Sequence, residues 1–160
     1  FVNIYSVLNL FSSSIYISYD LGNNMELSNQ LVNNNVAVYG TLRAGCGNHH
    51  ILEGLTFKRD VIQGFKMYDL GGFPYVVHTG DHDDSIAVEV YEVPDYDTAR
   101  RLDGLEGYHH TQGFTGFYNR IKVRTALGTE GYLYVFPQHE GEDEIESGDW
   151  VYHTNQRGWL

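Results

Sequence analysis

The sequence predicts one α+β domain built mainly from short strands. Its 160 residues fit a single hydrophobic core, and 42 % of them are hydrophobic against 19 % charged, which is enough apolar material for a packed interior. The 18 glycines and 13 tyrosines are typical of turns and strands and argue against an all-helical fold. Short apolar runs between Gly-rich turns predict the strands, and one stretch with helical periodicity predicts a helix.

The amino-terminal segment is treated separately from this domain. The first 24 residues contain one charged residue, Asp20, and lack both the continuous apolar stretch of a membrane span and the basic start of a secretory signal. The first methionine is Met25, so we expect the native start there and assign residues 1–35 to a leader or disordered segment. A genuine amino-terminal strand is the alternative. The domain then spans residues 36–153, and residues 154–160 form a tail.

The expected strands follow one another along the domain. In chain order they are residues 36–39, a bent strand or hairpin at 56–70, and residues 85–93, 118–124 and 131–136. Within residues 85–93, Ile86, Val88 and Val90 share one face and Glu89 lies on the other, which is typical of a half-buried strand. Residues 131–136 are apolar on both faces, so we expect a central strand there.

Residues 95–105 form the expected helix. Pro94 comes directly before it and Gly107 follows shortly after it, which is the usual arrangement of helix start and stop signals. At helical spacing, one apolar arc is formed by Tyr96, Ala99, Leu102 and Leu105. Glu106 projects inside this arc, so its carboxylate is turned toward the core.

Glu106 is the candidate general acid and base. Partial desolvation and the carboxyl end of the helix dipole both disfavour its charged form, so both raise its pKa. Asp103 lies three residues earlier, within interaction range, and its charge adds to this effect. A carboxyl group that titrates near neutral pH is suited to proton transfer. The alternative is an ordinary surface acid exposed by fraying of the last helical turn.

The loop after the first strand, GTLRAGCG, is a candidate anion-binding turn. Gly-rich turns after strands expose backbone N–H groups that bind carboxylates or phosphates. The spacing of Gly40 and Gly45, with no lysine following, does not match the phosphate-loop signature, so we expect no nucleotide. An ordinary tight turn is the alternative.

The net charge of -11 restricts the classes of partner. A surface of this sign repels phosphate backbones and anionic lipids, so we expect no nucleic acid and no membrane partner, and a small molecule is favoured. Cys46 is the only cysteine, which excludes an internal disulfide and is compatible with a reducing cytoplasm. Without an identifiable activating base, its thiol is interpreted as structural.

Two further groups of polar residues allow competing interpretations. Six of the eight histidines, together with three nearby acids, lack the spacing of a known metal motif, and we expect no metal site; they are His49, His50, His78, His82, His109, His110, Asp81, Asp83 and Asp84. Arg120, on the strand that begins at Tyr118, either binds a substrate carboxylate or forms a structural ion pair.

Four short motifs, in this order, resemble the gamma-glutamylcyclotransferase-like family, including its bacterial and gamma-glutamylamine-processing branches. They are VYGTLR with the Gly-Asn-His loop after it, LGGFP, LDGLEGY and SGDW, and the resemblance spans residues 36–150. It implies a small, partly open mixed β-barrel flanked by short helices, with a cavity at one mouth. In this family the YG[ST]L turn binds the glutamyl group and the glutamate of the LDxLEGY motif is the acid and base. The carried-over substrate-binding residues are Tyr39, Gly40, Thr41 and Leu42, and Glu106 is the carried-over catalytic residue.

The resemblance implies an enzyme that closes a gamma-glutamyl compound into 5-oxoproline and releases an amine or amino acid, an acyltransferase or lyase-type cyclisation without a cofactor. Tyr118 is added as a candidate substrate-binding residue, and we expect a monomer or weak dimer. The substrate stays open among gamma-glutamyl amino acids, gamma-glutamylamines and isopeptides, because the RAGCGNHH loop matches the amine-processing branch only in part. The alternative function is a non-catalytic domain of the same fold that binds a small molecule or a partner.

Overall fold

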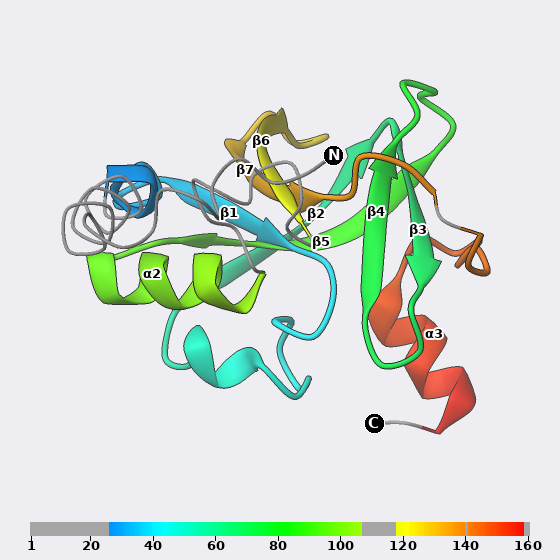
Figure 1. The fold of residues 1–160 in the computed structure, drawn as a ribbon, viewed down its shortest axis with the longest axis horizontal. Coiled ribbons are helices and arrows are strands. Elements are labelled where there is room, and N and C mark those ends of the chain that lie inside the picture. Colours follow the sequence, from blue (N-terminus) through cyan, green and yellow to red (C-terminus); the bar gives the residue numbers. More distant parts are fainter. Residues whose placement is uncertain (1–25, 107–117, 140, 159–160) are drawn as a thin grey trace, which may run out of the picture.

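Two sheets form the framework of the protein (Figure 1). The computed structural model describes residues 26–106, 118–139 and 141–158. The larger sheet has the strand order β2-β5-β1-β7-β6 and consists of β1 (Asn35–Val38), β2 (Phe57–Gln63), β5 (Ser85–Glu92), β6 (Asn119–Arg124) and β7 (Glu130–Val135). Strand β1 is parallel to β7, and the other pairings are antiparallel. The smaller sheet pairs β3 (Phe65–Asp69) with β4 (Pro74–His78).

The larger sheet is curled but not closed. The turn after β6 returns to the opposite edge strand, where the Ala126 N–H donates to the Val61 carbonyl of β2 at 2.8 Å. No strand pairing joins β2 to β6 among the residues that the structure describes. The smaller sheet is attached by single bridges, one of which joins Val77 to Phe136 just after β7. The α+β class is therefore confirmed, and the expected barrel is a curled sheet with a separate hairpin beside it.

A glycine divides the expected bent strand at residues 56–70 into β2 and β3. Gly64 has φ +88°, a conformation that glycine adopts without steric cost. Its N–H donates to the Asp84 carbonyl at 2.7 Å and its own carbonyl accepts from Thr79 at 2.7 Å. The two halves pair with different strands, so the segment is bent and is not a hairpin with itself.

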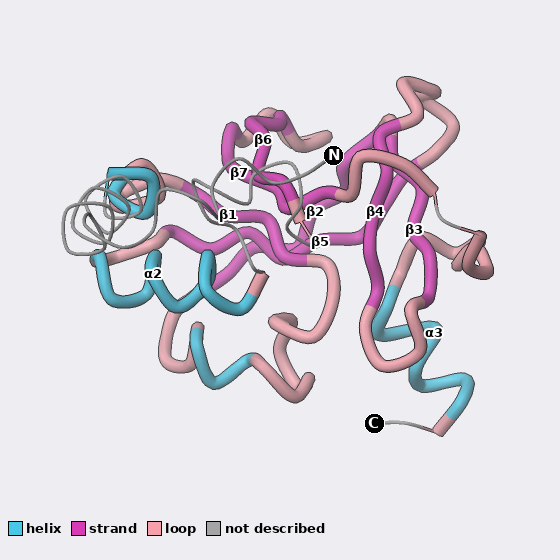
Figure 2. The backbone as a smooth tube through the Cα atoms, in the orientation of Figure 1, coloured by secondary structure: helices cyan, strands magenta, loops and turns pink. Residues whose placement is uncertain are grey.

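Helix α2 (Tyr96–Leu105) confirms the helix expected from periodicity. It begins at Asp95, whose carboxylate accepts a hydrogen bond from the Thr98 N–H at 2.8 Å. Ala99 and Leu102 of the predicted apolar arc are fully buried, whereas Tyr96 is partly buried and Leu105 is exposed, so the middle of the arc faces the core and its ends do not. The segment between β1 and β2 is mostly loop, with a short 3-10 helix η2 (His49–Ile51) in it (Figure 2).

Helix α3 (Trp150–Arg157) explains the SGDW motif. Gly148 has φ +64°, and a Cβ there would overlap the Ser85 carbonyl of β5. Asp149 caps the helix by accepting from two backbone N–H groups, and Trp150 is buried. The helix continues through residues 154–157, which the sequence alone predicts to be a tail.

Residues 26–34 also pack against the domain, although the sequence alone predicts a leader or disordered segment there. Residues 26–29 form a helical turn, Leu31 is fully buried, and the Ser28 hydroxyl donates to Asp103 of α2 at 2.9 Å. The expectation of Met25 as native start falls outside the described residues.

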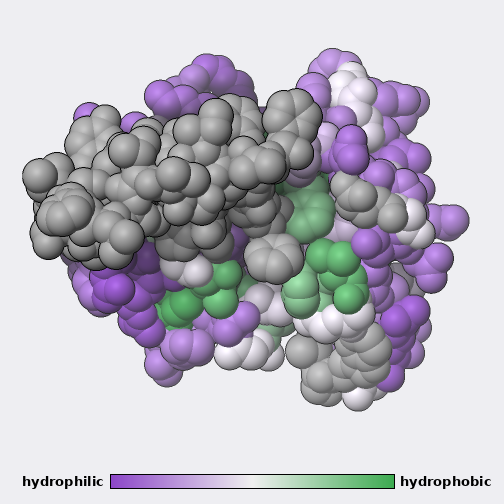
Figure 3. Space-filling model, in the orientation of Figure 1, coloured by the Kyte–Doolittle hydropathy of each residue, from purple (hydrophilic) through white to green (hydrophobic). Residues whose placement is uncertain are grey.

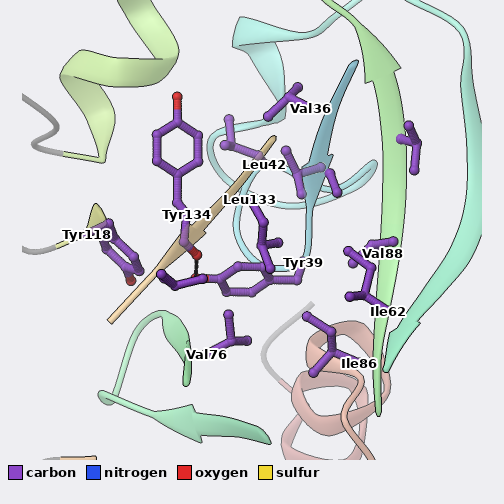
Figure 4. Packing of buried hydrophobic residues seen from close by; sticks show 14 of the residues in the cluster. Val36, Tyr39, Leu42, Ile62, Val76, Ile86, Val88, Tyr118, Leu133 and Tyr134 are labelled. Atoms are coloured by element: carbon purple, nitrogen blue, oxygen red, sulfur yellow. Dashed lines mark hydrogen bonds between the residues drawn. The ribbon is translucent and has the colours of Figure 1, made fainter. Parts of the chain in front are cut away.

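The core lies between the larger sheet, the β3–β4 hairpin and helix α2. Figure 4 shows Val76 of β4, Ile86 of β5 and Leu133 of β7 near the ring of Tyr39, with further aliphatic side chains of the core, among them Val36 of β1 and Ile62 of β2, beyond them. Hydrophobic side chains also reach the surface in the lower middle of the face drawn in Figure 3, between hydrophilic areas at its edges. None of the described helices has both the length and the apolar character needed to cross a bilayer.

Candidate active site

The turn directly after β1 is held from two sides. Tyr39 is buried, and its hydroxyl donates to the Tyr134 carbonyl of β7 at 2.8 Å (Figure 4). Asn48 holds the other side, because its backbone N–H and its Nδ2 donate to the carbonyl and the Oγ1 of Thr41, both at 2.9 Å. These bonds fix the backbone of the turn before any ligand arrives, which is the preorganisation that a binding site requires.

The residues that follow Tyr39 keep three successive backbone N–H groups open. Within the part of the chain that the structure describes, the N–H groups of Gly40, Thr41 and Leu42 donate to no protein acceptor. Gly40 and Leu42 are buried, and all three residues line one pocket. Successive N–H groups of this kind can bind a carboxylate or a developing oxyanion.

Glycine at position 40 is required by the close approach of the β3–β4 hairpin. A Cβ on Gly40 would lie 2.8 Å from Cγ and 2.9 Å from Cδ of Pro74. The Pro74 carbonyl also accepts a hydrogen bond from the Tyr118 hydroxyl at 2.7 Å. The YGTL and LGGFP motifs, which are distant in sequence, therefore meet at the same wall of the pocket.

Glu106 ends helix α2 and lines the same pocket. Its backbone N–H donates to the Leu102 carbonyl at 3.1 Å, so the last turn is formed and the side chain keeps its helical direction. The side chain is partly buried. Burial, followed by the nearby charge of Asp103, raises the pKa of Glu106 from 4.5 to about 8. Burial and the charge of Asp103 are both causes that the sequence predicts. The alternative of an exposed surface acid at the frayed end of the helix does not agree with this geometry.

A buried polar network lies behind Glu106. Asp103 is 3 % exposed, and its two carboxylate oxygens accept from Nη1 of Arg120 at 2.6 and 2.7 Å. The hydroxyls of Tyr134 and Ser28 complete the network, with bonds of 2.6 and 2.9 Å to Asp103. Arg120 is therefore a structural ion-pair partner, and the interpretation as a ligand for a substrate carboxylate is wrong.

All six predicted site residues meet at one pocket of about 340 Å³. They are Tyr39, Gly40, Thr41, Leu42, Glu106 and Tyr118. Further lining comes from β1, from Asn48, from the β3–β4 turn and from Tyr134. A concave site of this size, with one carboxyl group and several open N–H donors, is suited to a small polar molecule.

Comparison with known proteins identifies the family. Residues 36–152 match the sequence profile of the family described as gamma-glutamyl cyclotransferase, AIG2-like. The chain belongs to this family. A Vibrio cholerae protein provisionally named as a gamma-glutamylcyclotransferase is 34 % identical over 118 residues, which cover 72 % of this chain and 93 % of that protein. The gamma-L-glutamyl-butirosin B gamma-glutamyl cyclotransferase of Niallia circulans is 32 % identical over 123 residues, with 72 % and 74 % coverage.

Solved structures agree with this assignment to the gamma-glutamyl cyclotransferase family. The crystal structure of an uncharacterized Pyrococcus horikoshii protein aligns with a TM-score of 0.62 and 31 % identity, covering 78 % of this chain and 96 % of that one. The AIG2-like protein from mouse aligns with a TM-score of 0.56, covering 71 % of this chain and 86 % of the mouse protein. Its identity is 17 %, so this second likeness concerns the fold alone.

Three tyrosines contribute phenol groups to this cyclotransferase-family pocket. Burial is the main reason that the pKa values of Tyr39, Tyr118 and Tyr134 are all raised above their ordinary value of 10. The charge of Glu106 raises each of them further. All three therefore stay protonated, and their hydroxyls donate to the Tyr134 carbonyl, the Pro74 carbonyl and the Asp103 carboxylate, respectively.

A second buried network supports the loop beyond Leu42 and was missed by the sequence reasoning. Glu89 of β5 is 1 % exposed, so the expectation that this strand is half-buried is wrong. Its carboxylate accepts from the Ala44 N–H and the Tyr91 hydroxyl, both at 2.9 Å, and from Nε of Arg43 at 3.4 Å. Arg43 also donates to Asp149 at 2.7 Å. The signal in the sequence was a charged residue within an otherwise apolar strand.

The remaining candidates have structural surroundings or lie outside the described residues. Burial raises the pKa of the partly buried Cys46 thiol, which disfavours its thiolate form. Nδ1 of His49 lies 3.0 Å from the Leu42 carbonyl and supports the turn. Among the described residues no group of three or more potential ligands is arranged for a metal ion. The motif residues Gly107 and Tyr108, together with His109 and His110, lie outside the described residues.

Proposed function

We propose that this protein cyclises a gamma-glutamyl compound to 5-oxoproline with Glu106 as the single acid and base. Membership in the gamma-glutamyl cyclotransferase family supports the reaction class, and the name of the Niallia circulans relative supports it further. The observation that carries the assignment of residues is the pocket itself. It combines a carboxyl group of pKa about 8 with three open backbone N–H donors.

The reaction forms one bond and breaks one. The α-amine nitrogen of the glutamyl group attacks its own γ-carbonyl carbon, and the bond from that carbon to the leaving nitrogen then breaks. Both reacting groups belong to one molecule, so ring closure has a large effective concentration once the chain is folded in the pocket. The protein must mainly move protons and stabilise charge.

Glu106 moves the proton in two steps. Ionised Glu106 takes a proton from the substrate ammonium and thereby frees the nucleophilic nitrogen. The protonated side chain then gives this proton to the leaving nitrogen as the tetrahedral intermediate collapses, and the attacking nitrogen passes its remaining extra proton to the departing amine or to water, which leaves the lactam N–H. A pKa of about 8 makes both steps nearly balanced at neutral pH.

The YGTL turn binds the charged oxygens of the substrate. The open N–H groups of Gly40, Thr41 and Leu42 either hold the α-carboxylate or receive the oxyanion that develops on the γ-carbonyl. Loss of a donor to such an oxyanion costs on the order of 100-fold in rate in other enzymes. Tyr118 lines the pocket on the side of the YGTL turn, because its hydroxyl donates to the carbonyl of Pro74, which lies next to Gly40.

A substrate panel tests this proposal. Purified protein is incubated with gamma-glutamyl amino acids, gamma-glutamylamines and a gamma-glutamyl isopeptide, and 5-oxoproline is detected by mass spectrometry. We expect product from at least one compound with the wild type and loss of at least about 100-fold in kcat for Glu106→Gln. Glu92→Gln, at an exposed position, is the matched control and retains activity. Full turnover by Glu106→Gln would refute the mechanism.

The same panel tests the alternative function. A non-catalytic domain that only binds a ligand or partner gives binding by calorimetry and no 5-oxoproline from any compound. We also propose a cytoplasmic enzyme, a monomer or weak dimer without metal or cofactor, and a gamma-glutamylcyclotransferase-like domain that includes residues 36–153. The single cysteine supports the first of these points, and light scattering and metal analysis of the purified chain test the others.

A further inference from the structure

A short segment before β1 contacts the buried ion pair behind Glu106. This segment, residues 27–31, is called the amino-terminal clamp below, and it precedes residue 36, where the match to the family begins. The Ser28 hydroxyl donates to Oδ2 of Asp103 at 2.9 Å. The clamp therefore reaches the last turn of helix α2, three residues before the candidate catalytic group.

The clamp is anchored by bonds that do not involve the ion pair. Leu31 is fully buried, and its carbonyl accepts from the Asn34 N–H at 2.9 Å. The next bonds lead to Val93, just before α2, because the Asn33 N–H donates to the Val93 carbonyl at 2.8 Å and the Val93 N–H donates to the Asn34 carbonyl at 2.9 Å. The segment is therefore fixed near both ends of the helix that carries the ion pair.

The clamp also accepts hydrogen bonds from Arg120, the cation of the ion pair. Nη2 of Arg120 donates to the Leu27 carbonyl at 2.7 Å and to Oε1 of Gln30 at 3.2 Å. Nη1 makes the bonds to both oxygens of Asp103. A guanidinium and a carboxylate pair most strongly when two nitrogens bond one oxygen each. The clamp turns Nη2 away from Asp103 and so holds the pair outside that arrangement.

The clamp keeps the ion pair out of water. The side chains of Asp103 and Arg120 are 5 % and 1 % exposed, and Ser28 is buried beside them. Away from water a charge acts more strongly on its neighbours, because the effective dielectric constant is lower. The charge of Asp103 therefore acts on Glu106 with little screening.

Asp103 supplies the charge that acts on Glu106 among the described residues. The other titratable groups that face it are the phenols of Tyr39, Tyr118 and Tyr134, and burial raises the pKa of each, so all three are neutral. A change in the exposure or the pairing of Asp103 therefore changes the pKa of Glu106.

We propose that the amino-terminal clamp is a positioning element for catalysis, which holds the Asp103–Arg120 pair dry and turned so that Asp103 controls proton transfer by Glu106. This inference rests on the proposed function, and it gives residues before the family domain a part in the acid–base chemistry. No residue of the clamp lines the pocket, so the clamp acts through the ion pair and does not touch the substrate.

Loosening the clamp should make Glu106 more acidic. In Leu31→Ser the buried anchor is lost, so water reaches the ion pair and Nη2 of Arg120 is free to turn to Asp103. Both changes weaken the effect of Asp103, and we expect the midpoint of the Glu106 titration to fall by about 1 pH unit. The midpoint is measured by NMR on the full chain, labelled with 13C at the glutamate carboxyl groups, and Glu106→Gln assigns the signal.

Two variants of Gln30 change a single hydrogen bond at an exposed residue. Gln30→Met keeps the length of the side chain and removes the acceptor, which frees Nη2 of Arg120, so the midpoint should fall by about 0.3 pH units. Gln30→Glu keeps the acceptor and adds a negative charge that competes with Asp103 for Arg120, so the midpoint should rise. Asn29→Met, at an exposed residue of the same turn, is the control and should leave the midpoint unchanged.

The midpoints distinguish a positioning role from a structural one. A clamp that only stabilises the fold lowers the free energy of unfolding in Leu31→Ser and leaves every midpoint as in the wild type. That result, a higher midpoint in Leu31→Ser, or equal shifts in Gln30→Met and Asn29→Met would overturn the inference. If Leu31→Ser does not fold, the two Gln30 variants decide, because opposite shifts support the inference and unchanged midpoints refute it.

The outcome also separates the inference from the proposed function, because the titration needs no turnover. The expected shifts together with no 5-oxoproline from any compound would support control of Glu106 by the clamp and refute the cyclisation. Release of 5-oxoproline with unchanged midpoints in all variants would support the cyclisation and refute the clamp. Where both hold, the acid limb of kcat/KM should move with the midpoint in each variant.

Discussion

Asp103 and Arg120 form a buried ion pair behind the candidate catalytic carboxyl group. Nη1 of Arg120 reaches both carboxylate oxygens, and the two side chains are 5 % and 1 % exposed. Since Asp103 lies three residues before Glu106 on α2, its charge acts on Glu106 while its position is fixed by β6. The pair thus links the stability of the fold to the protonation of the site.

Breaking this ion pair should destabilise the protein strongly. Arg120→Met leaves the Asp103 carboxylate buried without its cation, and we expect the free energy of unfolding to fall by about 3–5 kcal/mol. The control is Arg124→Met on the same strand, which removes an exposed pair with Glu130 and should cost less than about 1 kcal/mol. Urea denaturation of both variants measures the difference. Similar losses in the two would show that the buried pair has no special role.

Adding one methyl group to the YGTL turn should damage activity more than stability. In Gly40→Ala the new Cβ meets the Pro74 ring at 2.8–2.9 Å, so the turn and its N–H groups must move away from the hairpin. We expect a stability loss of about 1–3 kcal/mol and a loss of kcat/KM of about tenfold or more. Gly47→Ala, in the same loop with no atom within 4 Å of the new Cβ, is the control. Equal kcat/KM values for the two variants would contradict the account.

The helix and its terminal glutamate could be predicted because their signals are local. The Asp95 cap, the apolar spacing of α2 and the position of Glu106 all lie within a dozen residues. Periodicity and capping act over that range, so they determine both the helix and the direction in which Glu106 points. The LDGLEGY and VYGTLR motifs then indicate that this helix end and the YGTL turn belong to one site, although the two segments are far apart in the sequence.

What the sequence could not reveal depends on partners that are distant in the chain. Glu89 is buried because Arg43 and a backbone N–H come to it from another loop, and no pattern within β5 contains that information. Arg120 pairs with Asp103 on a different element, so its role could not be chosen from its own strand. The contact of Ser28 with Asp103 spans 75 positions in the sequence, so no local pattern shows that Ser28 packs against the domain.

The protonation of Glu106 should make stability depend on pH. Its pKa is about 8 in the folded protein and 4.5 as the ordinary value, so above pH 4.5 the unfolded chain loses a proton that the folded protein keeps. The free energy of unfolding should therefore fall as pH rises from 4.5 to 8, by at most about 1.4 kcal/mol for each pH unit in this range. Above pH 8 this contribution levels off. Glu106→Gln should lose this dependence and exceed the wild type in stability at pH 9. A Glu92→Gln control should behave as the wild type, and identical curves for all three proteins would contradict the raised pKa.

The same group should control the pH dependence of catalysis. Free enzyme needs ionised Glu106 to accept the substrate proton, so kcat/KM should increase with pH up to about 8 and fall about tenfold per unit below it. The ammonium group of the substrate could produce a similar limb, and a variant distinguishes the two. Asp103→Asn removes a negative charge that raises the pKa of Glu106 and leaves the charge of Arg120 nearby, so both effects move the limb to lower pH. A limb that stays in place in Asp103→Asn would assign it to the substrate and would remove Glu106 from the role of base.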